Sequence, residues 1–122
     1  MNVLMVSGIY NSLSGLTAAQ TRITTAAHNT ANANTYGFKK NRALHQEVQP
    51  QGGVTTTIEQ VDTPGPVVFG ETENGLIAVE QSNVDLEEEA VNLLLGKRIF
   101  EANARALEIQ IKTFGSVLDI IE

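Results

Sequence analysis

Apolar residues recur at alternating spacings of three and four through the last third of the chain. Ten of the eleven positions in this stripe are apolar, and Lys97 is the exception. Such spacing keeps the stripe on one side of an α-helix while the helix supercoils about a partner. The positions are Leu86, Ala90, Leu93, Lys97, Phe100, Ala104, Leu107, Ile111, Phe114, Leu118 and Ile121. We therefore expect a long C-terminal helix that lies along other helices.

A weaker stripe opens the chain and predicts a second amphipathic helix, from about residue 3 to residue 34. Its positions are Ile9, Leu13, Leu16, Gln20, Ile23 and Ala27. The segment is rich in Gly, Ser and Thr, which are poorer helix formers than Ala, so packing against other helices must stabilise it. Asn residues and Gly37 follow it, and Gly37 is expected at the C′ position that ends the helix.

The middle of the chain predicts short strands separated by turns. Gly52-Gly53 separates the two β-like runs 42–49 and 54–61, and Pro64-Gly65-Pro66 then breaks the chain. Asn74-Gly75, a signal for a type I′ turn, joins the runs 67–69 and 76–80. One or two β-hairpins are therefore expected between the helices.

The start of the C-terminal helix is marked by Asp85 and the acidic run that follows it. Asp85 is expected to cap the first-turn amides while Glu88 reaches back, and negative charge there suits the helix dipole. The expected fold is mainly α with a small β insert (α+β), in which two long terminal helices form an antiparallel coiled coil. The expected domains are an N-terminal core helix (1–38), a β-rich insert (39–81) and a C-terminal coiled-coil helix (82–122).

Charge and composition exclude several classes of function. The residues up to position 46 carry four basic side chains and no acid, whereas all fourteen acids lie beyond them, for a net charge of −6. This distribution disfavours nucleic acid and favours contact between the head of one subunit and the acidic body of another. There is no cysteine, and no basic-apolar leader or membrane-spanning stretch is recognised. We expect no insertion into a membrane and export without a cleaved signal peptide.

No pattern indicates catalysis. His28 and His45 lie in different segments without a second ligand at metal spacing, and no phosphate-binding loop or nucleophile elbow is present. We therefore expect no enzyme activity, cofactor, metal or small-molecule substrate.

Four stretches carry a family resemblance. Residues 14–22 (SGLTAAQTR) and 27–39 (AHNTANANTYGFK) resemble the N-terminal signature of bacterial flagellar axial proteins. Residues 82–94 (SNVDLEEEAVNLL) and 97–105 (KRIFEANAR) resemble their C-terminal signature. The residues that match the motifs are Asn29, Asn32, Thr35, Gly37, Phe38, Asn83, Asp85, Arg98, Glu101 and Asn103. Both signatures occur in the right order and cover about half of the chain.

The resemblance implies a rod, hook or hook-associated protein of the flagellum, whose terminal helices line a hollow tube. The insert is too short for the outer domains of hook or distal rod proteins. The chain is most similar to proximal rod proteins, in particular flagellar basal-body rod protein C. The implied role is a self-assembling subunit of the periplasm-spanning rod of the basal body. The implied partners are copies of itself, other rod proteins and the flagellar type III export apparatus.

The residues expected to carry assembly are the apolar stripe positions. This assembly seam consists of Ile9, Leu13, Leu16, Ile23, Ala27, Leu86, Leu93, Phe100, Ala104, Leu107, Ile111, Phe114 and Leu118. Lys39, Lys40 and Arg42 are expected to meet the acidic run 87–89 of a neighbouring copy, or else to be solvated. The motif asparagines either bond between subunits or simply belong to helix ends. The alternative function is a non-polymerising coiled-coil adaptor or export-associated protein.

Overall fold

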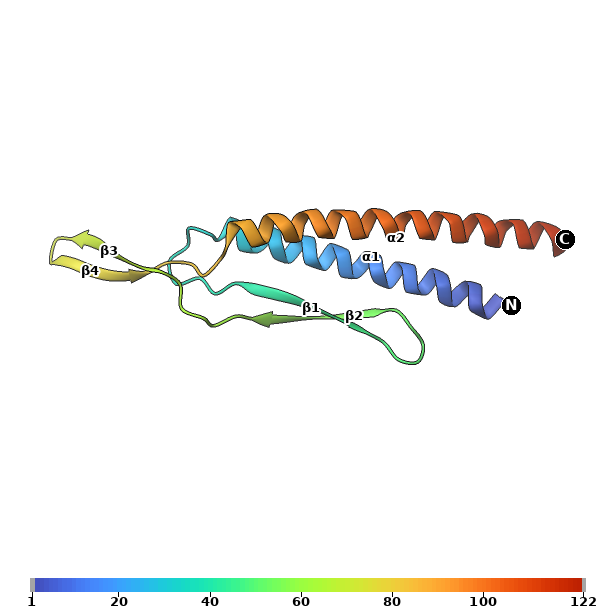
Figure 1. The fold of residues 1–122 in the computed structure, drawn as a ribbon, viewed down its shortest axis with the longest axis horizontal. Coiled ribbons are helices and arrows are strands. Elements are labelled where there is room, and N and C mark those ends of the chain that lie inside the picture. The colour runs from blue at the N-terminus through green and yellow to red at the C-terminus, as the bar shows by residue number, and fades with distance from the viewer. Residues whose placement is uncertain (1, 122) are drawn as a thin grey trace.

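The chain folds into two long helices with two β-hairpins between them. The computed structural model describes residues 2–121, with the side chains of residues 6–120. Its elements are α1 (Asn2–Ala31), β1 (Asn41–Glu47), β2 (Val54–Gln60), β3 (Val67–Thr72), β4 (Gly75–Glu80) and α2 (Leu86–Ile121). The helices run side by side in opposite directions, so that both termini lie at one end and the β3–β4 hairpin projects from the other (Figure 1). The predicted α+β class, two helices with a small hairpin region between them, is confirmed.

Helix α1 ends earlier than its sequence suggests. The side-chain amide of Asn32 donates to the carbonyl of His28, and its N–H donates to the carbonyl of Asn29. These bonds close the last turn at Ala31, so Gly37 is not the C′ residue that was predicted. Gly37 instead adopts a φ of 71° in the following turn and donates its N–H to the carbonyl of Glu80. It therefore joins the exit of α1 to the end of β4.

Helix α2 starts where the acidic run predicted. The Oδ1 atom of Asp85 accepts the N–H of Glu87 at 3.0 Å, as expected of an N-cap. The side chain of Glu88 does not reach back toward Asp85 as predicted. Its Oε2 atom instead lies 3.0 Å from Nζ of Lys40, because the start of β1 brings Lys40 beside the first turn of α2.

The two hairpins form separate two-stranded antiparallel sheets. Strands β1 and β2 pair from Asn41 with Gln60 to Glu47 with Val54, and β3 pairs with β4. Among the described residues only glycines have a positive φ. Asn74 therefore does not adopt the conformation of a type I′ turn, and Gly75, with a φ of 105°, takes the positive φ at this hairpin. The β1–β2 hairpin packs on α1.

The helices approach each other most closely where glycines and polar side chains meet, and Ile23 of the predicted α1 stripe also reaches this contact. On α1, Gly8, Gly15 and Asn29 share one face, because they lie at multiples of seven residues. They face Gln110, Asn103 and Glu89 of α2, which are also spaced by multiples of seven. Gly96 completes this close seam, since a Cβ there would lie 2.6 Å from Cγ1 of Ile23. The buried apolar side chains of the described region are Ala18, Ala19 and Ala26.

We predict that adding one methyl group at Gly96 destabilises the helix pair. The methyl group added by Gly96→Ala meets Ile23. In contrast, no atom outside its own turn of the helix lies within 4 Å of the methyl group added by Gly115→Ala. Gly115→Ala should gain about 0.5–1 kcal/mol because Ala favours helix. Gly96→Ala should be less stable than Gly115→Ala by about 1–3 kcal/mol, the usual cost of overpacking. Urea unfolding followed by circular dichroism measures both, and an equal gain for the two variants would contradict the close seam.

Candidate assembly interface

The predicted stripe of α2 lies beside the helix contact, not in it. Leu93, Ala104, Leu107 and Phe114 are half-buried along its edge. The other large members of the stripe are exposed: Leu86 by 55 %, Phe100 by 41 %, Ile111 by 55 % and Leu118 by 43 %. Phe100 and Ile111 are therefore largely open to solvent in the single chain, beside the close seam of small residues.

Apart from Ile23, which faces Gly96, the predicted stripe of α1 lies beside the same contact line. Ile9, Leu16 and Ile23 are half-buried, whereas Leu13 and Ala27 are exposed. The β1–β2 hairpin covers a different side of α1, where Ser14 Oγ accepts the N–H of Val54 at 3.0 Å and Asn29 bonds Asn41.

The two stripes adjoin each other across the helix pair. Leu16 of α1 and Ala104, Leu107 and Ile111 of α2 line a shared groove of about 370 Å³. We call the surface formed by both stripes, on the side away from the β1–β2 hairpin, the bare apolar face. An exposed apolar face of this kind is a candidate interaction surface.

The basic residues near the start of β1 find partners within the chain. Lys40 pairs with Glu88, and Lys39 pairs with Glu80 of β4. The prediction that these lysines meet the acidic run of a neighbouring copy is therefore corrected for Lys40, while Arg42 remains exposed. The bond from Lys39 lowers the pKa of Glu80, and the N–H of Gly65 acts in the same direction.

Asn29 joins three segments of the chain. Its side-chain Nδ2 donates to the carbonyl of Asn41 at 2.8 Å and to Oε1 of Glu89 at 3.1 Å. Its Oδ1 accepts the N–H of Asn41 at 3.0 Å. The residue is only 1 % exposed. Asn29 therefore fixes the first residue of β1 against both helices and does not lie on a surface that contacts other subunits.

Asn83 performs a similar task where the chain enters α2. Its Oδ1 accepts the N–H of Lys40 at 2.7 Å, and its Nδ2 donates to the carbonyls of Val61 and Thr63. One side chain thus binds the segment before β1 to the segment after β2. These backbone groups would otherwise lack partners, because neither segment continues into a wider sheet.

The other motif residues have local roles. Thr35 donates to Asn32 in the turn after α1, and the rings of His28 and Phe38 meet edge to face with centroids 5.6 Å apart. Arg98 and Glu101 pair at 3.6 Å on the exposed side of α2. Asn103 lies against Gly15 and donates to the carbonyl of Ile99.

Glu89 is a buried acid that the sequence did not reveal, since the acidic run was assigned only to the start of α2 and to contact with basic residues. It is 2 % exposed. Burial raises the pKa of its carboxyl, and the nearby Glu88 and Asp85 raise it further, against the Asn29 hydrogen bond and Lys40, which lower it. The seven-residue spacing from Glu89 to Gly96 to Asn103 was the signal that could have placed it in the seam.

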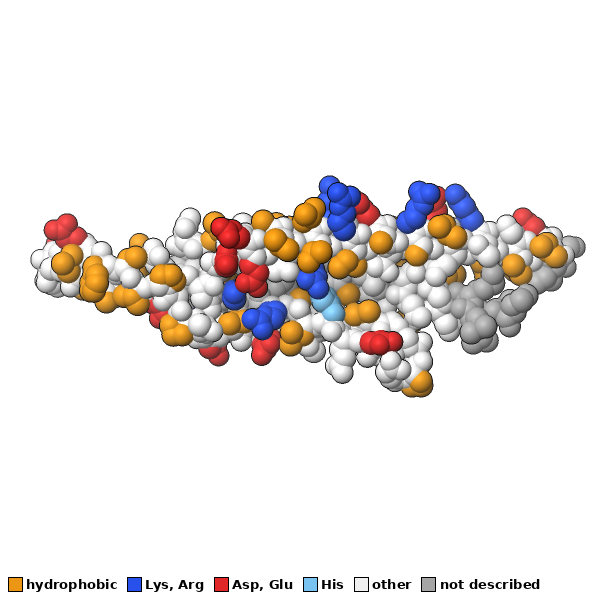
Figure 2. All heavy atoms as spheres, in the orientation of Figure 1, with side chains coloured by type: hydrophobic (Ala, Val, Ile, Leu, Met, Phe, Trp, Pro, Cys, Tyr) orange, Lys and Arg blue, Asp and Glu red, His pale blue; other side chains and the backbone are white. Residues whose placement is uncertain are grey.

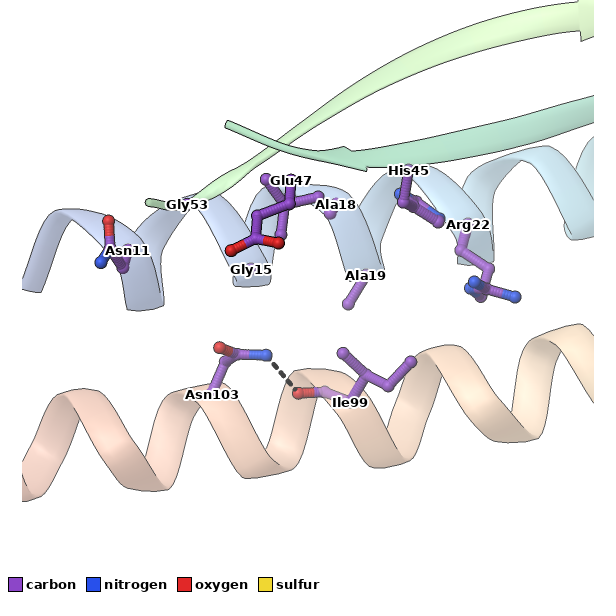
Figure 3. A pocket seen from close by; sticks show the side chains of 11 residues that line it. Asn11, Gly15, Ala18, Ala19, Arg22, His45, Glu47, Gly53, Ile99 and Asn103 are labelled. Carbon is purple, nitrogen blue, oxygen red and sulfur yellow. Dashed lines mark hydrogen bonds between the residues drawn. The ribbon is translucent and has the colours of Figure 1, made fainter. Parts of the chain in front are cut away.

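A second groove lies on the hairpin side of the helix pair. Figure 3 shows the side chains that line it, with α1 between the strands β1 and β2 on one side and α2 on the other. It has a volume of about 440 Å³, and its lining includes Asn11, Ala18, Arg22, His45, Ile99 and Asn103. Burial lowers the pKa of His45, and the positive charge of Arg22 lowers it further, so the imidazole is neutral at neutral pH. We call this cavity the hairpin-side groove.

The described residues show neither a metal cluster nor a membrane-spanning helix. No group of three or more His, Cys, Asp or Glu side chains among them is placed to hold a metal ion. Neither helix, over the part of the chain that is described, is long and apolar enough to cross a bilayer.

We predict that the stability of the fold depends on pH through Glu89. The raised pKa means that the native state binds a proton more tightly than the unfolded state, so unfolding free energy falls as pH rises through that pKa. Glu89→Gln keeps an oxygen for Asn29 and removes the charge. The variant should be more stable than wild type at pH 7, and the difference should shrink as pH falls toward about 4.3.

Urea titrations at several pH values test this expectation. Glu59→Gln, at an exposed position of β2, is the control and should change stability by less than about 0.5 kcal/mol. A Glu89→Gln variant that is less stable than wild type at neutral pH would contradict the assignment.

We also predict that Asn29→Ala is strongly destabilising. The substitution leaves the half-buried N–H and carbonyl of Asn41 and the buried carboxylate of Glu89 without their partner, at a cost of about 2–4 kcal/mol. Asn34→Ala, at an exposed position of the turn, is the matched control and should be nearly neutral. Thermal unfolding of the two variants would refute the prediction if their midpoints agreed.

Comparison with protein families finds a match at each end of the chain. A family described as "Flagella basal body rod protein" matches residues 9–39. A second, described as "Flagellar basal body rod FlgEFG protein C-terminal", matches residues 78–120. The matches cover α1 from Ile9 onward with its following turn, and α2 to Ile120 with the end of β4. These segments contain most of the close seam and the bare apolar face. No curated protein matches the chain significantly.

Proposed function

This chain belongs to the flagellar basal body rod protein family, and on that premise we propose that it is a structural subunit that self-assembles helically into the hollow drive shaft. Membership of the family implies location in the basal body and association with other rod components. Rod families are structural and non-enzymatic, and the proposal assigns this chain no catalytic role. Export through the flagellar type III apparatus, without a cleaved signal peptide, is part of the proposal.

The bare apolar face is the observation that carries the proposal. Burying a Leu, Ile or Phe side chain contributes about 1.5–3 kcal/mol, and several such residues of α2 are 41–55 % exposed in the single chain. Residues from both matched segments form this face. A subunit whose apolar surface spans both terminal helices is suited to contact neighbouring helices on a tube wall.

This surface also separates the core part of the proposed subunit from its outer part. We propose that the antiparallel helix pair is the coiled-coil core of the subunit, formed by regions 1–38 and 82–122, and that the β-rich insert 39–81 is its outer part. The charged side of α2, which includes Arg98 and Arg105, remains in solvent. The shortness of the insert supports a proximal rod position of the kind that flagellar basal-body rod protein C occupies.

The proposal predicts that charge on the bare apolar face prevents assembly. Phe100→Asp combined with Ile111→Asp places two carboxylates among exposed apolar residues and should abolish concentration-dependent association in sedimentation velocity. The helix pair should stay folded, because neither side chain lies in the close seam. The matched control, Arg105→Asp with Ser116→Asp at exposed positions away from that face, should assemble as wild type does.

The same experiment separates the rod subunit from the alternative, a non-polymerising coiled-coil adaptor. An adaptor would form a stable dimer whose mass does not change with concentration. Undiminished association of the Phe100→Asp, Ile111→Asp variant would refute the role of the bare apolar face.

A further inference from the structure

The β3–β4 hairpin stands apart from the rest of the molecule. Its strands pair with each other and contact no other helix or strand in residues 2–121. Its apolar side chains are open to solvent, with Phe69 74 % and Leu76 72 % exposed, and Figure 2 shows hydrophobic side chains gathered along this projection. A lone two-stranded hairpin is marginally stable in water. We call this hairpin the projecting arm.

One face of the projecting arm combines apolar and acidic side chains. Val67, Phe69 and Glu71 alternate along β3 and so point to the same side. Leu76 lies opposite Glu71 in the register and joins this side. The acid therefore sits at the outer end of an apolar face, close to the turn of the hairpin.

The hairpin-side groove offers the complementary surface. Part of its lining is apolar, because Ala18 of α1 and Ile99 of α2 contribute to it. Within the described residues, the buried polar atoms without a hydrogen-bond partner are Asn11 Oδ1, Arg22 Nε and His45 Nε2, and all three side chains line this groove. Buried polar groups left without partners are costly, so the groove is suited to receive a polar as well as an apolar ligand.

The positive charge of Arg22 makes it the expected partner for the acidic end of the projecting arm. Arg22 Nη1 bonds Asn92 at 3.1 Å, whereas its Nε is buried without a hydrogen-bond partner. Arg22 also lines the adjoining hollow, together with Lys40, Arg42, Glu88 and Glu89. Of these, Lys40 is already paired with Glu88. Glu47 lies in the groove with Asn11 and Gly53, where it would repel an acid.

We propose that the projecting arm of one copy docks into the hairpin-side groove of a second copy. Phe69 and Leu76 cover the Ala18 and Ile99 surface, and the carboxylate of Glu71 pairs with the guanidinium of Arg22. The inference rests on the proposed self-assembly and names one of its contacts. The arm projects away from the groove of its own chain (Figure 1), so the occupant is another molecule. Such a head-to-tail contact need not close on itself and extends into a filament.

Charge reversal tests the ion pair. Glu71→Arg alone and Arg22→Glu alone should each raise the concentration for half-maximal assembly at least about tenfold. The double variant should recover most of this loss, because the pair is restored with opposite polarity. Glu59→Arg, at an exposed site outside the groove, is the control and should stay within about twofold of wild type. Single reversals that stay within that range, or a double variant that shows no recovery, would overturn the proposal.

Cysteine cross-linking tests the location independently, because the natural chain has no cysteine. Phe69→Cys copies mixed with Ile99→Cys copies should form a mixed disulfide faster than Phe69→Cys copies mixed with Ile111→Cys copies. Equal rates would overturn the docking site. If assembly persists but neither test responds, the docking fails and the proposed function stands. If assembly is also indifferent to Phe100→Asp with Ile111→Asp, the proposed function fails as well.

Discussion

The close approach of α1 and α2 governs the remainder of the structure. A Cβ at Gly96 would lie 2.6 Å from Cγ1 of Ile23, and a Cβ at Gly15 would overlap the Asn103 amide. At both points one of the two facing residues is a glycine, which leaves room for the side chain of Ile23 or Asn103, and most other large apolar residues lie to either side. The same contact that pairs the helices therefore leaves Phe100 and Ile111 uncovered. The apolar residues buried in the described region are alanines, so many of the large apolar side chains remain exposed in the single chain.

Side-chain amides secure the segments that leave the helix pair. Asn29 and Asn83 bond backbone groups where the chain enters β1 and where it leaves β2. A two-stranded sheet has two open edges, and its terminal backbone groups have no neighbouring strand to bond. The two asparagines satisfy them and also fix where the hairpin sits on α1. Glu89 accepts a further hydrogen bond from the side chain of Asn29. Its carboxyl is buried, and this burial raises its pKa.

The molecule presents different surfaces in different directions. The bare apolar face lies on the side of the helix pair away from the β1–β2 hairpin, and the hairpin-side groove lies between that hairpin and α2. The projecting arm extends from the end opposite the termini (Figure 1). A subunit of a helical tube needs contacts both around and along the tube, and a single surface cannot supply both. The two contacts proposed for this chain meet that requirement. One uses the bare apolar face, and the other joins the projecting arm to the hairpin-side groove through apolar and charged side chains.

The sequence by itself determined the elements and the family. Spacings of three and four predicted both helices, Asp85 marked the start of α2, and the glycines and Asn74 located the hairpins, because these signals act over a few residues. Paired terminal motifs indicated the rod family. The tertiary structure alone decided which line of each helix meets the other. Periodicity shows that Leu107 and Ile111 share a side, but a smaller seam of the same period, through Gly96 and Asn103, packs more closely. The burial of Glu89 and Asn29 likewise depends on segments distant in sequence.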